Sequence, residues 1–264
     1  MLVAFHATLH RILIACICAT ALDAQSERQP ESFQLGIGMQ LRELHQEAAK
    51  HLSEFVRDHA DHELLAEGYY RLAHSRTELL QITPAIQDFR AALAHGGAQF
   101  LLRAESQYRL AKLLHKNGDP TSALTCINEL IKEINQDHYL VVAATYARGE
   151  LQRDLKNDEA AAKSFAKAAN LSAGKQTDFL FPSLYQGGFA HLRMQHFDNA
   201  AAAFTKAQNV APSQAAKGEC LYLFGDAQLR LRNHQQADQA FRKAIEIPSD
   251  YQDCLLYTSP SPRD

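Results

Sequence analysis

The sequence predicts an all-α protein, a linear array of about six helix–turn–helix hairpins. Three observations carry this prediction. An alanine followed four residues later by a large apolar residue recurs every 37 to 39 residues, a small residue lies twelve positions before each alanine, and a tyrosine precedes that small residue by three positions in most copies. A fixed period of this length is typical of helical repeat proteins, whose neighbouring units bury a continuous core.

The second helix of each hairpin is marked by the alanine and its large apolar neighbour. Residues four apart lie on one face of a helix, so these pairs can fill the space between one hairpin and the next. A degenerate first copy keeps the same register. The pairs are Ala48/Leu52, Ala85/Phe89, Ala123/Ile127, Ala161/Phe165, Ala200/Phe204 and Ala237/Phe241.

The first helix of each hairpin carries the small residue, which allows two antiparallel helices to approach closely. These positions are Gly36, Ala73, Ala111, Gly149, Gly188 and Gly225. The turns agree with this arrangement, because Asp119 can cap a helix whose first residue is Pro120. Pro212 and Pro248 fall where second helices are expected to stop.

These residues resemble the tetratricopeptide repeat family, whose hairpin carries a small residue on the first helix and an alanine with an aromatic residue on the second. The match is carried by Leu72–Ala73, Leu110–Ala111, Tyr222–Gly225 and the trio Ala237, Phe241 and Ala244, and the resemblance covers about residues 31–251. It implies a right-handed superhelical solenoid that binds a peptide or protein segment on its concave face. The chain departs from the family in its period, which exceeds the usual ~34 residues, and in having no tryptophan.

The period divides the chain into consecutive segments. We expect a signal peptide at 1–24, and a tail at 254–264 that is not native. Between them we expect a degenerate hairpin at 29–65, hairpins at 66–103, 104–141, 142–180 and 181–217, and the truncated end of the array at 218–253.

The first 24 residues are expected to direct export. Arg11 precedes an apolar run, Ile12–Leu22, that has the length of a signal-peptide core and is too short to span a bilayer. Cleavage is expected after Ala21 or Ala24. Two alternatives stay open: a buried N-terminal helix, and a lipoprotein anchored through Cys16, since the residues leading to that cysteine resemble a bacterial lipobox.

A narrower resemblance points to the bacterial cell envelope. Residues 55–62, followed by 66–73, resemble envelope repeat proteins, among them outer-membrane assembly lipoproteins and accessory proteins of the Tol–Pal system. Together with the export signal, this favours a scaffold in the periplasm or at the periphery of the outer membrane, within an envelope complex. The alternative is the exported repeat region of a larger protein whose C-terminal part carries the activity.

The last eleven residues, 254–264, break the repeat pattern. They resemble the in-frame translation of a transposase sequencing adapter, so we expect the native sequence to end near Asp253 here and the array to continue in the intact protein. A genuine Ser-Pro tail is the alternative. Of the five cysteines, three lie in the expected signal peptide or tail, which leaves Cys126 and Cys220 in the array. Their hairpins are separated by two others, so the two thiols are too distant for a disulfide. Both are expected to be buried apolar residues.

Composition and motifs argue against catalysis, metal binding and nucleic-acid binding. The formal net charge is −3 and no stretch is strongly basic, which disfavours nucleic acid as a partner. His59/His62 and His191/His196 are closely spaced, but no metal-binding motif accompanies them. Nucleophile and phosphate-binding motifs are absent from the sequence as well. We therefore expect no enzyme activity, no cofactor, no metal and no membrane span in the mature chain.

The candidate partner-binding surface is a row of tyrosines, one on each first helix. The row consists of Tyr70, Tyr108, Tyr146, Tyr185 and Tyr222, with Phe33 at its head. First helices line the concave face in the proteins this chain resembles, and a tyrosine offers flat apolar area and a hydroxyl at low entropic cost. One helical turn further on, residues of varied character are expected to set specificity: His74, Lys112, Glu150, Phe189 and Asp226. The alternative is that each ring packs between neighbouring helices.

Overall fold

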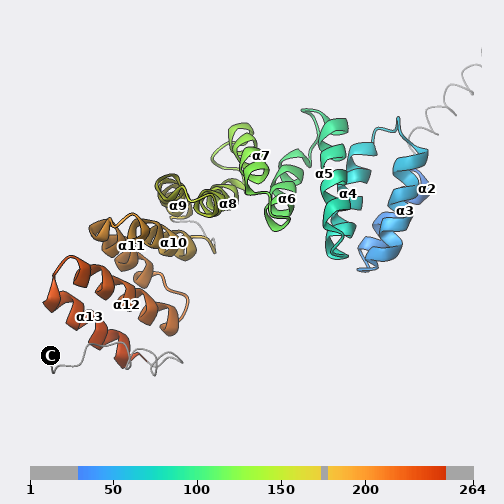
Figure 1. Ribbon diagram of the computed structural model, residues 1–264. Helices are drawn as coiled ribbons and strands as arrows, with labels where there is room; N and C mark the ends of the chain where they lie inside the picture. The colour runs from blue at the N-terminus through green and yellow to red at the C-terminus, as the bar shows by residue number, and fades with distance from the viewer. Residues whose placement is uncertain (1–28, 174–177, 248–264) are drawn as a thin grey trace, which may run out of the picture. The chain divides into compact units, whose positions relative to one another are not determined.

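The computed structural model describes residues 29–173 and 178–247, and these form twelve α-helices and no strand (Figure 1). This confirms the all-α helical repeat fold predicted from the period. The predicted signal peptide at 1–24, the alternative lipidation site Cys16 and the predicted non-native tail at 254–264 lie outside the described residues.

The helices pair into hairpins along the chain. One compact unit ends at Arg103, and a second begins at Ala104. The first unit contains α2 (Glu31–Gln40), α3 (His45–Asp58), α4 (Leu65–Glu78) and α5 (Ile82–Gly96). Within it α2 packs on α3, α3 on α4, and α4 on α5.

The second unit continues the same arrangement through four further hairpins. Its first helices are α6 (Arg103–Lys116), α8 (Val141–Asp154), α10 (Leu180–Arg193) and α12 (Gln214–Arg230), and its second helices are α7 (Pro120–Glu133), α9 (Asp158–Ser172), α11 (Phe197–Asn209) and α13 (His234–Glu246). From α7 to α13, each helix packs on the next one in the sequence. Within the second unit, the hairpins from α7 to α13 therefore contact one another in chain order.

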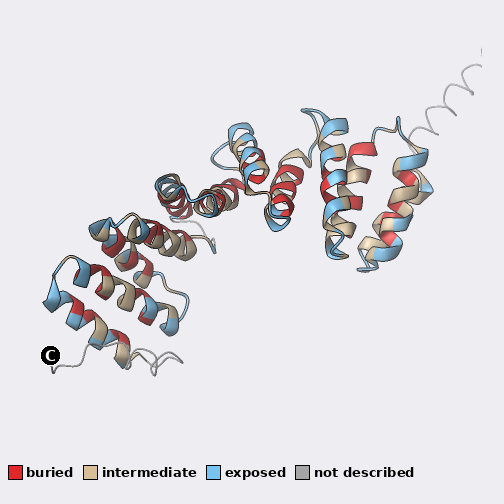
Figure 2. Ribbon diagram, in the orientation of Figure 1, coloured by how far each residue is buried: buried red, intermediate tan, exposed pale blue. Residues whose placement is uncertain are grey.

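The core includes the residues that the period identified on the second helices, together with apolar residues of the first helices such as Leu72 and Leu151. Buried residues lie along the helix faces that meet neighbouring helices (Figure 2). Phe89, Phe165 and Phe204 are fully buried, as are their alanine partners, whereas Phe241 is partly exposed. Burying a side chain of this size contributes about 1.5–3 kcal/mol, so one such residue per hairpin is a large part of the hairpin's stability.

The small residues of the first helices face these large side chains. A Cβ atom added to Gly149 would lie 2.7 Å from the ring of Phe165, and one added to Gly225 would lie 2.7 Å from the ring of Phe241. Contacts this short do not occur between real side chains. The spacing of twelve residues in the sequence therefore encodes the closest approach of the two helices in a hairpin.

The turn inside each hairpin reverses the chain through a residue with positive φ. Gly118 occupies this position in one hairpin, and in the other five it is Glu43, Leu80, Lys156, Gln195 and Arg232, with φ between 59° and 61°. The following backbone amide closes the turn; for example, Gln81 N donates to Arg76 O at 2.8 Å. This pattern is a Schellman helix end.

Side-chain caps start some of the second helices. Asp119 Oδ1 accepts a hydrogen bond of 3.0 Å from the amide of Ser122, and Pro120 is the first helical residue, which confirms the predicted cap. Cys126 and Cys220 are both buried, as predicted. No described helix is both long and apolar enough to cross a bilayer.

Candidate functional site

The predicted tyrosine row lies on the first helices, and each tyrosine is partly exposed. Tyr70 is on α4, and the other four are on α6, α8, α10 and α12. Four of the rings lie against the large second-helix residue of their own hairpin, with centroid distances of 5.8 Å for Tyr70–Phe89, 5.5 Å for Tyr146–Phe165, 6.1 Å for Tyr185–Phe204 and 5.6 Å for Tyr222–Phe241. One face of each of these rings therefore belongs to the core, as the packing alternative holds, while the rest of the side chain is accessible.

The five predicted specificity residues lie in different surroundings. Phe189 packs on Tyr185 and Phe204, with centroid distances of 5.0 and 5.7 Å. Asp226 forms an ion pair with Arg230 on its own helix at 2.9 Å. The ring of His74 lies 6.3 Å from that of His45.

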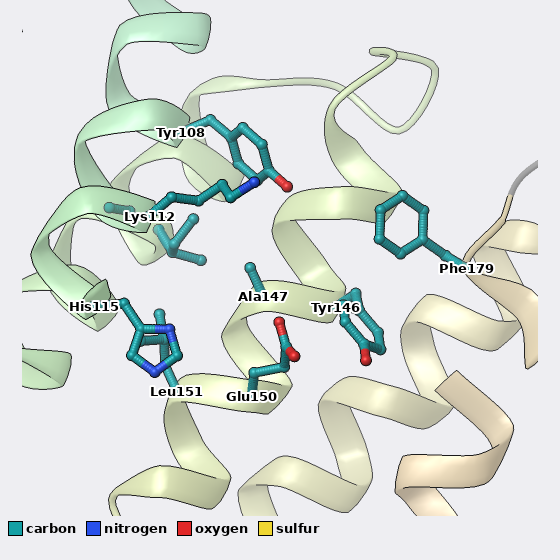
Figure 3. Close-up of a pocket in the computed structure, with 10 residues that line it drawn as sticks. Tyr108, Lys112, His115, Tyr146, Ala147, Glu150, Leu151 and Phe179 are labelled. Atoms are coloured by element: carbon teal, nitrogen blue, oxygen red, sulfur yellow. The ribbon is translucent and has the colours of Figure 1, made fainter. Parts of the chain in front are cut away.

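The remaining two predicted specificity residues, Lys112 and Glu150, share one pocket with two of the tyrosines. The pocket has a volume of about 240 Å³ and lies between the first helices α6 and α8 (Figure 3). It is lined by Tyr108, Ala111, Lys112 and His115 of α6, Ile127 of α7, Tyr146, Ala147, Glu150 and Leu151 of α8, and Phe179. The structure thus brings four of the ten predicted site residues together in one place.

Helical spacing sets the lining of this pocket. Tyr108 and Lys112 are four residues apart on α6, as are Tyr146 and Glu150 on α8, so each pair occupies one face of its helix. The Lys112 Nζ lies 5.8 Å from the centroid of the Tyr108 ring. Phe179, just before α10, closes the far side, with its ring centroid 5.3 Å from that of Tyr146.

The Glu150 carboxylate lies in the lining of the pocket, on the same helix as Tyr146 (Figure 3). Burial raises the pKa of Glu150, and the positive charges of Arg153, His115 and Lys112 oppose this shift. Burial also raises the pKa of Tyr146 to about 12, to which the negative charge of Glu150 and a hydrogen bond with it add. Both groups therefore lie in surroundings that are poorer in water than the surface.

A polar contact ties the two helices together at the edge of the pocket. His115 Nε2 of α6 lies 2.6 Å from Asp154 Oδ2 of α8. Arg153, next to it on α8, lies 2.9 Å from the same carboxylate group and donates to Gln186 of α10 at 3.2 Å. These contacts hold successive first helices in register and so fix the width of the pocket.

Six of the ten lining residues were not among the predicted site residues. Two of the six, Phe179 and His115, bring an aromatic or ionisable ring to the pocket, and only Phe179 carries a sequence signal. Phe179 occupies the position just before a first helix where Leu64 and Leu140 stand in other hairpins. A large apolar residue thus recurs there, and only its aromatic character distinguishes Phe179. His115 has no equivalent sequence signal, because its role depends on the approach of α8.

No group of three or more His, Cys, Asp or Glu side chains is arranged to hold a metal ion in residues 29–173 and 178–247. Within each closely spaced histidine pair the two rings are separated: the ring centroids of His59 and His62 are 6.2 Å apart, as are those of His191 and His196.

Residues 104–137 and 218–251 match the sequence profile of the family described as tetratricopeptide repeat. The first of these segments covers α7 and all of α6 after its first residue, and these helices supply one wall of the pocket. No curated protein matches the chain.

Solved structures resemble the fold over most of the chain. MamA protein is 17% identical with a TM-score of 0.59, covering 74% of this chain and 97% of that one. BtubC (BKLC) from P. vanneervenii is 16% identical with a TM-score of 0.59, covering 89% and 96%. YrrB, described as a TPR protein with an unusual peptide-binding site, is 17% identical with a TM-score of 0.59, covering 80% and 98%. At these identities the likeness is one of fold.

Proposed function

This chain is a tetratricopeptide repeat protein, and we propose that it is a non-enzymatic scaffold that binds a peptide or protein segment on the first helices of its second unit. Tetratricopeptide repeats generally act as scaffolds for protein–protein interaction, and the fold is consistent with that role. The finer claim concerns where the segment binds, and it rests on the geometry of one pocket.

The pocket between α6 and α8 is the observation that carries the proposal. It combines accessible aromatic surface from Tyr108 and Tyr146 with the polar groups of Lys112 and Glu150. Aromatic side chains with a polar tip are enriched where proteins bind other proteins, because they offer large apolar area and a hydrogen-bonding group together. The similar fold of YrrB, whose description includes a peptide-binding site, supports the same kind of ligand.

Site-specific photo-crosslinking tests this proposal. A photoreactive phenylalanine analogue would replace the exposed Lys112 at the pocket, and in a matched variant the exposed Lys163 on α9, which lies outside the pocket. The two variants are compared in intact cells and in envelope extracts. We expect a discrete crosslinked protein from position 112 and none, or a much weaker one, from position 163. Equal products at both positions, or none at 112, would contradict the proposed site.

The cellular location we propose is the periplasm or the periphery of the outer membrane. Arg11 followed by the apolar run Ile12–Leu22 supports export, and the resemblance of residues 55–62 and 66–73 to envelope repeat proteins supports an envelope complex as partner. N-terminal sequencing of the protein made in a bacterial host tests this: an exported protein starts at Leu22 or Gln25. A lipid on Cys16 would establish the lipoprotein alternative, and cytoplasmic protein that begins at Met1 would refute export.

A further inference from the structure

We propose that the pocket between α6 and α8 receives one basic side chain, a lysine or an arginine, of the bound segment. This inference rests on the proposed function and specifies the partner of the same site: a segment in which a single cationic side chain is the anchor. The occupant follows from the charge, the ring surfaces and the size of the pocket, each of which is a separate observation.

The Glu150 carboxylate supplies the charge. It is partly buried in the lining of the pocket, and among the residues that the structure describes it forms no ion pair. A carboxylate that has lost part of its hydration without gaining a cation is destabilised. A cation entering the pocket would restore that lost interaction, so the pocket is complementary to positive charge.

The basic side chains near Glu150 are engaged elsewhere. Lys112 is exposed, and its ammonium group lies over the Tyr108 ring, apart from the Glu150 carboxylate (Figure 3). His115 and Arg153 both contact the carboxylate of Asp154, at 2.6 and 2.9 Å. The place beside Glu150 is therefore open to a cation from the partner.

Aromatic rings supply the rest of the binding surface. Tyr146 and Phe179 lie with their centroids 5.3 Å apart on one side of the pocket, and Tyr108 lies on the other. The face of an aromatic ring attracts an ammonium or guanidinium group, and its apolar area suits the methylene stem of a long basic side chain. An acidic side chain would gain nothing from these faces and would be repelled by Glu150.

The volume of the pocket favours a single side chain over a whole metabolite. It measures about 240 Å³, whereas sites that enclose drug-sized ligands occupy roughly 300–1,000 Å³. A site of this size and openness on the surface of a repeat protein is suited to one anchoring residue of a longer segment, whose remaining residues lie outside the pocket.

Selection from a displayed library of random linear peptides tests the inference on the whole protein. We expect the selected peptides to share one basic position, and replacement of that residue by norleucine to weaken binding about tenfold or more, the effect of losing one hydrogen-bonded ion pair. Glu150→Gln should weaken binding of the parent peptide by a similar factor. Norleucine and Glu150→Gln together should cost little more than either alone, which identifies Glu150 as the group that the basic residue meets.

Two further variants sharpen the test. Glu129→Gln removes the same charge from an exposed position on α7 outside the pocket and should leave the affinity unchanged. Lys112→Gln removes a competing positive charge and should tighten binding of the basic peptide. A thermal melting curve of each variant, followed by the helical signal, verifies that it folds.

The outcomes separate this inference from the proposed function. Peptides that bind at the pocket without a shared basic residue, or with a shared acidic one, would overturn the inference and leave the scaffold proposal intact. The same holds if Glu150→Gln and Glu129→Gln have equal effects on a basic peptide. If no peptide is enriched on the wild-type protein over the bare support, both proposals fail.

Discussion

Gly188 of α10 lies so close to Phe204 of α11 that a Cβ atom added to the glycine would be 2.6 Å from the ring atom Cε1. Its neighbour Gly187 is also buried, yet a Cβ there would meet nothing closer than 3.6 Å, the Cβ atom of Phe165. Two adjacent glycines on one helix therefore differ in whether the fold leaves room for a methyl group.

We expect Gly188→Ala to destabilise the protein and Gly187→Ala to stabilise it slightly. The fully buried Phe204 ring has little room to move, so overpacking should cost about 1–3 kcal/mol, of which the better helix propensity of alanine returns at most about 1 kcal/mol. Gly187→Ala gains that propensity without a clash and serves as the matched control. Denaturant unfolding of the two variants measures the difference, and equal stabilities would show that the hairpin can open to admit the methyl group.

Leu80 closes the turn between α4 and α5 with a φ of 59° while its side chain is 70% exposed. A left-handed backbone costs a residue with a Cβ about 1–2 kcal/mol, and glycine avoids this cost. We therefore expect Leu80→Gly to raise the free energy of unfolding by about 0.5–1 kcal/mol, since the exposed side chain contributes little packing. Gly118→Ala at the equivalent turn, where φ is 83°, should have the opposite sign. Thermal melting of both variants tests the pair.

Asp88 of α5 forms an ion pair with Arg76 of α4 at 2.7 Å and has a side chain only 8% exposed. Burial raises the pKa of Asp88 from 3.8 to about 6, and Arg76 offsets only part of the shift. Between about pH 4 and 6 the native state therefore holds a proton that the unfolded chain has released. As the pH rises through this window, Asp88 should lower the free energy of unfolding by an amount of order 2 kcal/mol.

The substitution Asp88→Asn removes this titration. The stability of the wild-type protein relative to Asp88→Asn should be greatest near pH 4 and should decline until about pH 6, as followed by denaturant melts across the range. Asp61→Asn, at an exposed position of the same unit, corrects for the loss of one acidic group. If the stability of the wild-type protein relative to Asp88→Asn instead increases with pH, the attraction of Arg76 for the Asp88 carboxylate outweighs the effect of burial.

The Tyr185 hydroxyl donates a hydrogen bond to Glu219 and so links α10 to α12. Tyr222 occupies the equivalent place in the next hairpin, but in the described residues its hydroxyl has no hydrogen-bond partner. We expect Tyr185→Phe to cost about 0.5–1.5 kcal/mol of stability and Tyr222→Phe to cost less than about 0.5 kcal/mol. Denaturant midpoints distinguish the two, and amide exchange in α12 should rise only for Tyr185→Phe.

The helical hairpins were predictable because their period depends on packing, which the sequence records directly. The alanine at each second helix and the small residue twelve positions earlier are both needed for two helices to approach, so their spacing locates both helices. The turns were less predictable. At Gly118 the glycine itself indicates a positive φ, but at Leu80 and Lys156, which also have positive φ, the residue type gives no such indication. There the conformation is imposed by the two helices that the turn joins.

The tyrosine row was predictable from the period, but the different surroundings of the residues one helical turn beyond each tyrosine were not. Phe189 lies against Phe204, and Asp226 pairs with Arg230, while Glu150 remains without an ion pair among the described residues. All of these occupy the same place in their hairpins, so sequence spacing treats them as equivalent. What distinguishes them is the approach of other side chains, and the role of each in binding a partner stays a prediction.

From α7 to α13, each helix packs on the helix that follows it in the sequence. The contacts that stabilise this part of the chain therefore join segments that the ribosome makes within seconds of one another. Because these segments are close in the sequence, the entropic cost of closing the loop between them is small. Chains with such local contacts fold quickly, and their N-terminal portions can fold before synthesis is complete. The same locality would allow the hairpins of the second unit to form one after another during synthesis, and, under the export that we propose, one after another as they leave the translocation channel.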